Sequence, residues 1–208
     1  PIQGEASATS QLVNLPPAAE SIESQPSEVQ ANDTQSVAIE APKPVEATDD
    51  TSAESAAHSV PDNAGPAALI AAARSGDPKA LFQVGMRYSN GEDVKRNMTE
   101  AAKWFTQSAQ SGFAPAQYSV GSLYEKGIGV ERDVSQALDW YEKAAVQGNA
   151  RAMHNLAVIY AMGNPPAVQP NMDTAVDWFK KAADFGIKDS QFNLGILYGQ
   201  GMGVPQNL

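Results

Sequence analysis

A fixed order of small, aromatic and capping residues recurs along the chain at intervals of 36 residues. The interval lengthens to 38 after Gly163, because Asn164 to Ala167 adds two residues to a loop. The three full rows are Ala80, Gly85, Tyr88, Gly91, Asn97, Ala101, Trp104, Phe105, Ala109, Gly112; Ala116, Gly121, Tyr124, Gly127, Asp133, Ala137, Trp140, Tyr141, Ala145, Gly148; and Ala152, Ala157, Tyr160, Gly163, Asn171, Ala175, Trp178, Phe179, Ala183, Gly186. A fourth, shorter row contains Ser190, Gly195, Tyr198 and Gly201. A fixed period of about 20–50 residues is the signature of a solenoid, in which each repeat stacks on its neighbours.

Each row predicts two antiparallel helices, A and B, joined by short loops. Helix A of the first repeat is expected from about residue 78 to 89, after Asp77-Pro78, an N-cap with proline in the first turn. Helix B begins each time at a cap followed by a polar residue three positions later, as in a capping box: Asn97 with Glu100, Asp133 with Gln136, and Asn171 with Thr174. Helix B ends each time at a glycine, where a left-handed residue is needed: Gly112, Gly148 and Gly186.

The expected fold class is all-α, an α/α superhelical solenoid preceded by a disordered tail. The folded domain is expected over residues 65–208, with its eight helices in the order B, AB, AB, AB, A. It divides into a half repeat at 65–76, full repeats at about 77–112, 113–148 and 149–186, and a half repeat at 187–208. Tyrosines of helix A and tryptophans of helix B are expected to fill the space between helices. Trp140→Ala in the central repeat should therefore cost about 3–5 kcal/mol.

Residues 1–64 form a linker of different composition, rich in Pro, Ser and Ala. The linker contains eleven acidic residues and one basic residue, and every Trp, Tyr and Phe of the chain lies after it. A segment so charged and without aromatic residues buries too little apolar surface to offset the entropy of ordering it. We therefore expect residues 1–64 to be disordered and to contribute nothing to folding.

The composition also excludes several classes of function. Residues 65–208 contain 13 basic and 13 acidic residues, and a neutral folded part with an acidic linker argues against binding to nucleic acid or to anionic membranes. The chain has no cysteine, which excludes disulfide-stapled repeats and thiolate metal sites. No stretch of about 18 apolar residues is present, so we expect no membrane insertion of these residues. Because the chain lacks an initial Met and its last row is incomplete, we expect it to be a fragment.

No pattern in the chain predicts a catalytic residue, a cofactor or a metal site. The sequences Gly127-Ile128-Gly129 and Gly201-Met202-Gly203 lack the strand and the third glycine of a phosphate loop, so we interpret them as turns between helices. His154 occupies an aromatic position, which indicates packing; the residues at that position in the other rows are Phe82, Tyr118 and Phe192. With no second histidine in the folded part, no nucleophile–His–acid arrangement can be assembled, and we predict that the protein is not an enzyme.

The row A-x4-G-x2-Y-x2-G-x5-[ND]-x3-A-x2-W-[YF]-x-K-A-A-x2-G resembles the Sel-one-like repeat, the 36-residue relative of the tetratricopeptide repeat. Residues 137–145, Ala-Leu-Asp-Trp-Tyr-Glu-Lys-Ala-Ala, match it closely. The first repeat departs from the pattern in its loop at 91–94, and the third departs through its two-residue insertion. The resemblance covers residues 65–208 and implies tetratricopeptide-like helix pairs.

Two segments, Gly148–Ala157 and Asp189–Tyr198, are similar to the C-terminal repeats of the PodJ family, the polar localisation factors of alphaproteobacteria. The acidic linker fits the same architecture. The resemblance implies an inner-membrane protein at the cell pole, with a cytoplasmic coiled-coil half, a single membrane span and these residues in the periplasm. It also implies a scaffold that recruits polar proteins.

One stripe of helix A is the candidate partner-binding surface. Helical spacing places residues 79, 83, 86 and 90 and their equivalents on one face, where an amide recurs at 83, 155 and 193. Related helical repeats hold extended peptides with such amides, although exposed polar stripes are also the norm for a solvated face. The candidate partner-binding residues are Lys79, Gln83, Ser119, Arg151, Asn155 and Asn193.

We therefore expect a non-enzymatic scaffold without cofactors, whose partners are other proteins or peptides, cell-envelope or peptidoglycan-associated ones included. Other bacterial proteins with this repeat imply two alternatives. One is a periplasmic regulator that binds a sensor kinase, and the other is a cell-wall-related hydrolase or penicillin-binding module. The missing nucleophile constellation counts against the second alternative.

The last helix is expected to lack its partner. It contains an apolar set, and Asn207 stands where the other repeats cap helix B; the apolar residues are Phe192, Leu194, Ile196, Leu197 and Tyr198. We expect a helix B to follow Leu208 in a longer protein. Without it, the last helix is expected to fray or to associate with another copy, because exposed apolar patches favour association.

Overall fold

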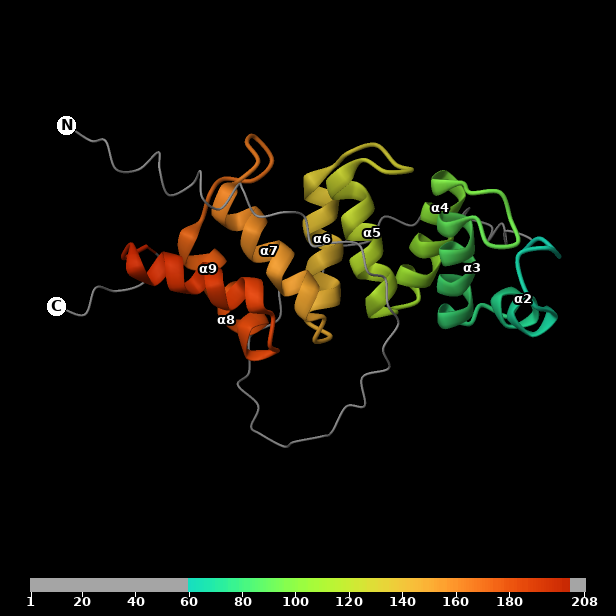
Figure 1. The fold of residues 1–208 in the computed structure, drawn as a ribbon. Coiled ribbons are helices and arrows are strands. Elements are labelled where there is room, and N and C mark those ends of the chain that lie inside the picture. The colour runs from blue at the N-terminus through green and yellow to red at the C-terminus, as the bar shows by residue number, and fades with distance from the viewer. Residues whose placement is uncertain (1–59, 203–208) are drawn as a thin grey trace, which may run out of the picture. The chain divides into compact units, whose positions relative to one another are not determined.

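The computed structural model describes residues 60–202, which form helices joined by short loops (Figure 1). Eight helices lie in this part of the chain: α2 (Ala67–Arg74), α3 (Pro78–Asn90), α4 (Met98–Gln110), α5 (Ala114–Lys126), α6 (Val134–Ala145), α7 (Ala150–Met162), α8 (Met172–Asp184) and α9 (Lys188–Gly199). Helices α3, α5, α7 and α9 are the expected A helices, and α2, α4, α6 and α8 are the expected B helices. The all-α class and the order of the eight helices are confirmed.

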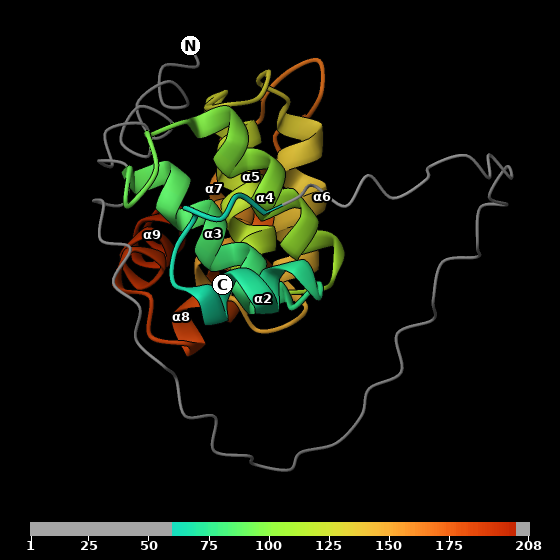
Figure 2. The same cartoon turned by 90° about the vertical axis from the view of Figure 1, so that its right-hand side faces the viewer.

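Each helix packs on the helix before it and the helix after it in the chain. Figure 1 shows the pairs α3/α4, α5/α6 and α7/α8 following one another in chain order, and Figure 2 looks along the same row from the end of α2. Four clusters of buried side chains lie along the stack, and each cluster draws on neighbouring helices only. A structure held together by contacts between neighbours is a solenoid, as the period predicts.

The expected caps of the B helices are present, but none is a capping box, because the backbone N–H of each cap residue donates to a tyrosine carbonyl near the end of helix A. The side chains of Asn97, Asp133 and Asn171 accept hydrogen bonds from backbone N–H groups of the first turns of α4, α6 and α8. Glu100 does not reach back to Asn97; it forms an ion pair with Lys103 at 2.7 Å. The backbone N–H of Asn97 instead donates to the carbonyl of Tyr88 at 2.9 Å. The Tyr88 carbonyl, near the end of helix A, therefore accepts the hydrogen bond from the backbone N–H that the Glu100 side chain would accept in a capping box.

The B helices end where the sequence predicts. Gly112 has φ of 86°, and the N–H of Phe113 donates to the carbonyl of Ser108 at 3.3 Å. This six-residue closure at a left-handed glycine is a Schellman motif, which satisfies carbonyls that the helix leaves free. The same closure follows α6 and α8.

The closest approach within a helix pair occurs where a glycine of helix A meets a ring of helix B. A Cβ atom on Gly85 would lie 2.7 Å from the ring of Phe105, and one on Gly121 would lie 2.6 Å from the ring of Tyr141. Tyr141 is fully buried, as are Phe179 and most of Phe105. The glycines thus let one large ring per pair lie directly on the backbone of helix A.

This arrangement corrects the expected role of the tryptophans. Trp104 is buried, with 3% of its surface exposed, but Trp140 and Trp178 are only partly buried. A lysine ammonium group lies over each of these two partly buried rings. The Nζ atom of Lys143 is 4.2 Å from the ring centroid of Trp140, and that of Lys181 is 4.0 Å from the ring centroid of Trp178. In the central repeat the main packing residue is Tyr141, because its position in helix B faces helix A and that of Trp140 faces the neighbouring repeat and solvent.

The two-residue insertion of the third repeat is absorbed in the loop between α7 and α8. Asn164 and Val168 exchange backbone hydrogen bonds of 2.7 and 3.0 Å, which close the extra residues into a small loop. Val168 is buried and anchors the loop on the core. The helices on either side therefore keep their register with the other repeats.

The packed part of the chain begins before the expected boundary at residue 65. Val60 and Ala64 are fully buried against α2 and α3. The guanidinium of Arg74 donates to the carbonyl of Val60 at 2.8 Å and to the carboxylate of Asp62 at 2.6 Å. The boundary was expected too late because two small apolar residues suffice to cover the first helices. The expectation for residues 1–59 lies outside the described residues.

In the part of the chain that the structure describes, no helix has both the length and the apolar character needed to cross a membrane.

A chain that starts at Gly65 should be less stable than one that starts at residue 60. The shorter chain loses the burial of Val60, which is worth about 2 kcal/mol, and the hydrogen bond from Arg74. Urea denaturation of the two chains measures the difference. Equal midpoints and slopes would show that residues 60–64 do not contribute to the core.

Tyr141→Ala should destabilise the protein more than Trp140→Ala. The first change empties a fully buried site and should cost about 3–5 kcal/mol. The second removes a partly exposed ring and should cost no more than about 2 kcal/mol. Urea unfolding followed by far-UV circular dichroism compares the two variants, and equal losses would contradict the assignment of Tyr141 as the central ring.

Candidate functional site

The six candidate partner-binding residues of the A helices lie in different environments. Lys79, Gln83 and Arg151 are exposed on α3 and α7. Ser119 is partly buried, and its hydroxyl donates to the carbonyl of Pro115 at 3.0 Å. Asn155 is partly buried and Asn193 is fully buried. The equal spacing of the amides therefore does not produce a continuous exposed row, and the accessible part of this surface is Lys79, Gln83 and Arg151.

Asn155 belongs to a hydrogen-bonded network that joins three helices. Its amide donates to the Tyr141 hydroxyl at 2.9 Å, and that hydroxyl donates to the carboxylate of Glu125 at 2.6 Å. Burial raises the pKa of Tyr141, and the negative charge of Glu125 raises it further, so Tyr141 stays protonated and donates. The network links α5, α6 and α7. It is unique to the central repeat, because the residues equivalent to Tyr141 are Phe105 and Phe179.

Tyr118 lies beside this network at the edge of the accessible surface. Its ring is 5.7 Å from that of Tyr141 and tilted by 37°. Burial raises the pKa of Tyr118, and the nearby charge of Arg151 partly opposes this effect. Sequence reasoning placed Tyr118 only in the packing position, but its neighbour Arg151 and the polar network below it form a mixed aromatic and polar surface between α5 and α7.

Asn193 has the position of Asn155 but not its partner. The equivalent of Tyr141 in the next repeat is Phe179, which has no hydroxyl. Neither the oxygen nor the nitrogen of the Asn193 amide has a hydrogen-bond partner among the described residues, and the side chain is fully buried. Unpaired buried polar groups are costly, so this amide weakens the contact of α9 with the stack.

His154 packs as its aromatic position predicts. Its ring meets Phe179 edge-on at 5.7 Å, and Nδ1 lies 2.8 Å from the Ser190 hydroxyl. Burial lowers the pKa of His154, and the charge of Asp189 partly offsets this. Ser190, His154 and Asp189 have the residue types of a nucleophile–His–acid set. Ser190 is fully buried, however, so no substrate can reach its hydroxyl. The pair joins α7 to α9.

The turn at Gly127–Gly129 forms no ligand site, and the second glycine-rich turn of the sequence extends to Gly203, outside the described residues. Gly127 ends α5, and a Cβ atom on Gly129 would lie 2.3 Å from the carbonyl of Met98. The loop is therefore packed against the start of α4 and not open to a phosphate, which confirms the interpretation as a turn. Among residues 60–202, no group of three or more His, Cys, Asp or Glu side chains is placed to hold a metal ion.

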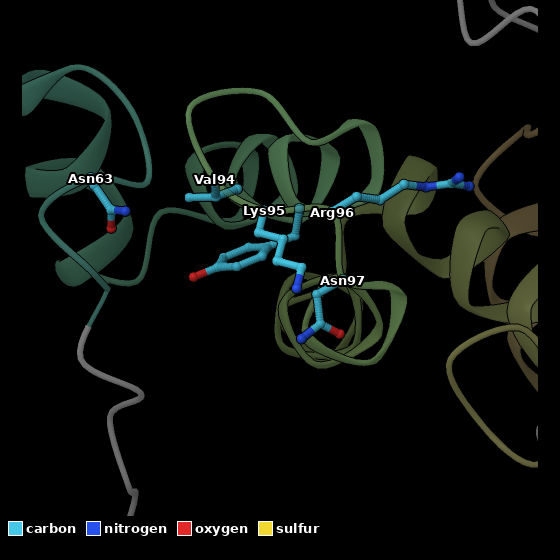
Figure 3. A pocket seen from close by; sticks show the side chains of 6 residues that line it. Asn63, Val94, Lys95, Arg96 and Asn97 are labelled. Atoms are coloured by element: carbon cyan, nitrogen blue, oxygen red, sulfur yellow. The ribbon is translucent and has the colours of Figure 1, made fainter.

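A pocket beside the loop between α3 and α4 is open and does not form a built binding site. Its volume is about 320 Å³, and its lining residues are Asn63, Tyr88, Val94, Lys95, Arg96 and Asn97 (Figure 3). Arg96 points away from the other lining side chains in Figure 3, and its Nε donates to the carbonyl of Ser89 at 3.0 Å. Asn97 caps α4. These two side chains hold the protein's own backbone, so the pocket offers little to a ligand.

Asn193→Leu should stabilise the protein. The change replaces an amide without partners by an apolar group of similar size, which should raise the free energy of unfolding by about 1–3 kcal/mol. The matched variant Asn155→Leu breaks the bond to Tyr141 and should lower it by about 1 kcal/mol. Urea denaturation of both variants tests the assignment, and destabilisation by Asn193→Leu would show that the amide has a partner.

Comparison with known proteins identifies the repeat. The profile described as Sel1 repeat matches residues 78–113, 114–149, 150–185 and 188–208, which together are more than half of the chain. The matched segments differ from the expected repeats by no more than one residue at each end. No curated protein matches the chain significantly, so the finer resemblance to polar localisation factors stays a prediction.

Two solved structures share the architecture. The crystal structure of a Sel1 repeat protein from Oxalobacter formigenes has 32% sequence identity and a TM-score of 0.62, and the match covers 67% of this chain and 56% of that one. The structure of c5321, a protective antigen of uropathogenic Escherichia coli with an SLR fold, has 38% identity and a TM-score of 0.63, covering 67% of this chain and 29% of that one. The chain thus spans about half of the first relative and less than a third of the second. Helix order, caps, ring contacts and these matches agree: the chain belongs to the Sel1 repeat family.

Proposed function

We propose that the chain is a protein-interaction scaffold that forms the periplasmic repeat region of a bacterial cell-pole organising factor. Sel1 repeats mediate binding between proteins and are in general not enzymes. The observation that carries the proposal is the exposed surface of the A helices α3 and α7, where the stack of repeats presents Lys79, Gln83 and Arg151.

The side chains on this surface are suited to noncovalent binding. Lys79 and Arg151 offer positive charge at the first turns of α3 and α7, and Gln83 offers an amide one turn further along α3. Tyr118 adds a partly buried ring beside Arg151, and arginine and aromatic side chains are the residues that most often dominate binding energy in interfaces. The surface is spread over α3, α5 and α7, which suits an extended peptide or a flat protein face better than a small molecule.

The periplasmic and polar part of the proposal is supported by sequence. The segments Gly148–Ala157 and Asp189–Tyr198 and the acidic linker resemble the C-terminal region of alphaproteobacterial polar localisation factors. In such an arrangement the linker would separate the repeats from the membrane, because a charged Pro-rich chain is extended. The repeats would then meet cell-envelope proteins at a distance from the bilayer.

Photo-crosslinking tests the binding surface. A photoreactive amino acid at Gln83 or at Arg151 should link the full chain to envelope proteins in alphaproteobacterial cells. The same amino acid at Lys180, an exposed residue of the B helix α8, serves as the matched control and should give no such product. Crosslinks from Lys180 in place of those from the A helices would overturn the choice of surface.

A second measurement tests the location in the cell. The chain, exported to the periplasm and fused to a fluorescent protein that folds there, should form foci at a cell pole. Charge reversal at Arg151 should disperse these foci without changing the circular dichroism spectrum, since the residue is exposed. A uniform periplasmic signal from the unaltered chain would refute the polar role while leaving the scaffold role to the crosslinking test.

A further inference from the structure

The A helices α3, α5 and α7 carry an excess of positive charge, and the B helices do not. These three A helices contain one acidic residue, Glu125, and four basic residues, Lys79, Arg87, Lys126 and Arg151. The B helices α4, α6 and α8 together contain more acidic than basic residues. Residues 65–208 are neutral in total, so this difference gives the A helices a positive surface.

Three of these cations are available to a partner. Lys79, Lys126 and Arg151 are exposed, and none of them forms a hydrogen bond or an ion pair with another residue of the described part of the chain. The ion pairs in that part are made by other basic residues. Helical spacing places all three cations on the stripe of helix A that begins at residue 79, and no acidic residue of α3, α5 or α7 shares this stripe.

Arg151 is the cation best placed to hold an anion. Its positive charge opposes the rise in the pKa of Tyr118, so the guanidinium lies near the Tyr118 hydroxyl. Burial raises the pKa of Tyr118, and the hydroxyl therefore stays protonated as a donor. Asn155 lies one turn after Arg151 on α7 and is fixed by its 2.9 Å hydrogen bond to Tyr141. A guanidinium and a hydroxyl donor thus lie together over a fixed polar network.

No acidic residue of the described chain forms an ion pair with Arg151. Glu125 lies nearby, but its carboxylate accepts the hydrogen bond of the Tyr141 hydroxyl at 2.6 Å. The cap of α7 is Asn149, which carries no charge. In α9 the position of Arg151 is occupied by Asp189, so the positive surface ends at α7. The position beside Arg151 therefore has donors for a carboxylate and no carboxylate of its own.

We infer that the stripe over α3, α5 and α7 binds an extended acidic segment of a partner protein, with one carboxylate of that segment held between Arg151 and Tyr118. The guanidinium donates to the carboxylate oxygens, and the Tyr118 hydroxyl donates to one of them. Lys79 and Lys126 attract further acidic residues of the segment. Charge complementarity selects this occupant, because a basic segment would be repelled and a neutral one would gain nothing from the three cations.

This partner chemistry rests on the scaffold role proposed above. It concerns the same surface as that proposal and narrows the partner from any protein to one that offers an acidic, extended segment. It does not depend on the location of the chain at a cell pole.

Two designed peptides test the chemistry. Both are end-blocked, fluorescently labelled and about 12 residues long, which gives a reach of roughly 40 Å when extended. One repeats Ser-Glu-Gly and the other Ser-Gln-Gly, so they differ in charge and hardly in size. In a polarisation titration with the full chain, the glutamate peptide should bind at least about tenfold more tightly. Salt at about 1 M should remove most of this difference, because it screens exposed charges.

Variants of the chain locate the carboxylate. Arg151→Gln removes the guanidinium and should weaken binding of the glutamate peptide at least about fivefold, and Arg151→Lys should recover part of the loss, because the charge returns without the planar fork. Tyr118→Phe keeps the ring and should weaken binding about threefold. Lys180→Gln removes an exposed cation of the B helix α8 and should leave binding unchanged. Circular dichroism confirms that the variants keep their helices.

Three outcomes would overturn the inference. Equal binding of the two peptides would show that the stripe does not recognise carboxylates. Equal losses from Arg151→Gln and Lys180→Gln would show a general attraction between charges and no site at Arg151. Binding that appears only with a chain that starts at residue 60 would assign the stripe to the chain's own acidic linker.

The crosslinking test of the scaffold role gives a separate result. Crosslinks from Gln83 together with equal binding of the two peptides would leave the scaffold role in place and refute the acidic partner. Preferential binding of the glutamate peptide without any crosslinks would keep the carboxylate site and count against the scaffold role in cells.

Discussion

The stack depends on one contact that recurs within each helix pair, an aromatic ring of helix B lying on a small residue of helix A. Gly85 under Phe105 and Gly121 under Tyr141 bring the backbones together around a ring that water does not reach. In the third pair Ala157 and Phe179 share one buried cluster. The ring and the small residue are 20 positions apart in the first two pairs and 22 in the third, where the inserted residues lie in the loop between them. The two-residue insertion at Asn164 is compatible with the fold because a closed loop absorbs it before it reaches the contact.

Features that depend on local sequence could be predicted, and features that depend on burial could not. The helix order, the caps at Asn97, Asp133 and Asn171 and the glycine stops follow from residues close to one another in the chain, so the period was sufficient to place them. Trp140 and Tyr141 are adjacent and both aromatic, and only the direction of the neighbouring helix decides which of them is central. The early start of the packed region at Val60 was missed for a similar reason, since a short apolar segment in an acidic context carries no periodic signal.

The burial of the candidate site residues could also not be predicted from the sequence. Gln83, Asn155 and Asn193 occupy one position of the repeat, yet one is exposed, one is bonded to Tyr141 and one is buried without a partner. Their environments differ because the facing residue of the preceding B helix differs, a hydroxyl at Tyr141 and none at Phe179. The position of a residue in the repeat therefore predicts on which face of its helix it lies, but not whether that face is accessible to solvent. The one available signal was the single tyrosine among the three ring positions, which marks where a polar network could form.

The three tryptophans make the fluorescence of this solenoid sensitive to the state of its individual repeats. Each full repeat contains one indole, and the three indoles lie in different surroundings, Trp104 in the core and Trp140 and Trp178 partly exposed under lysine ammonium groups. A buried indole emits at shorter wavelength than a solvated one, and a cation close to the ring alters its emission. Fluorescence from single-tryptophan versions of the chain would therefore report on one repeat at a time. The molecule thus contains, in its own packing residues, a set of local spectroscopic labels along the direction in which its repeats are stacked.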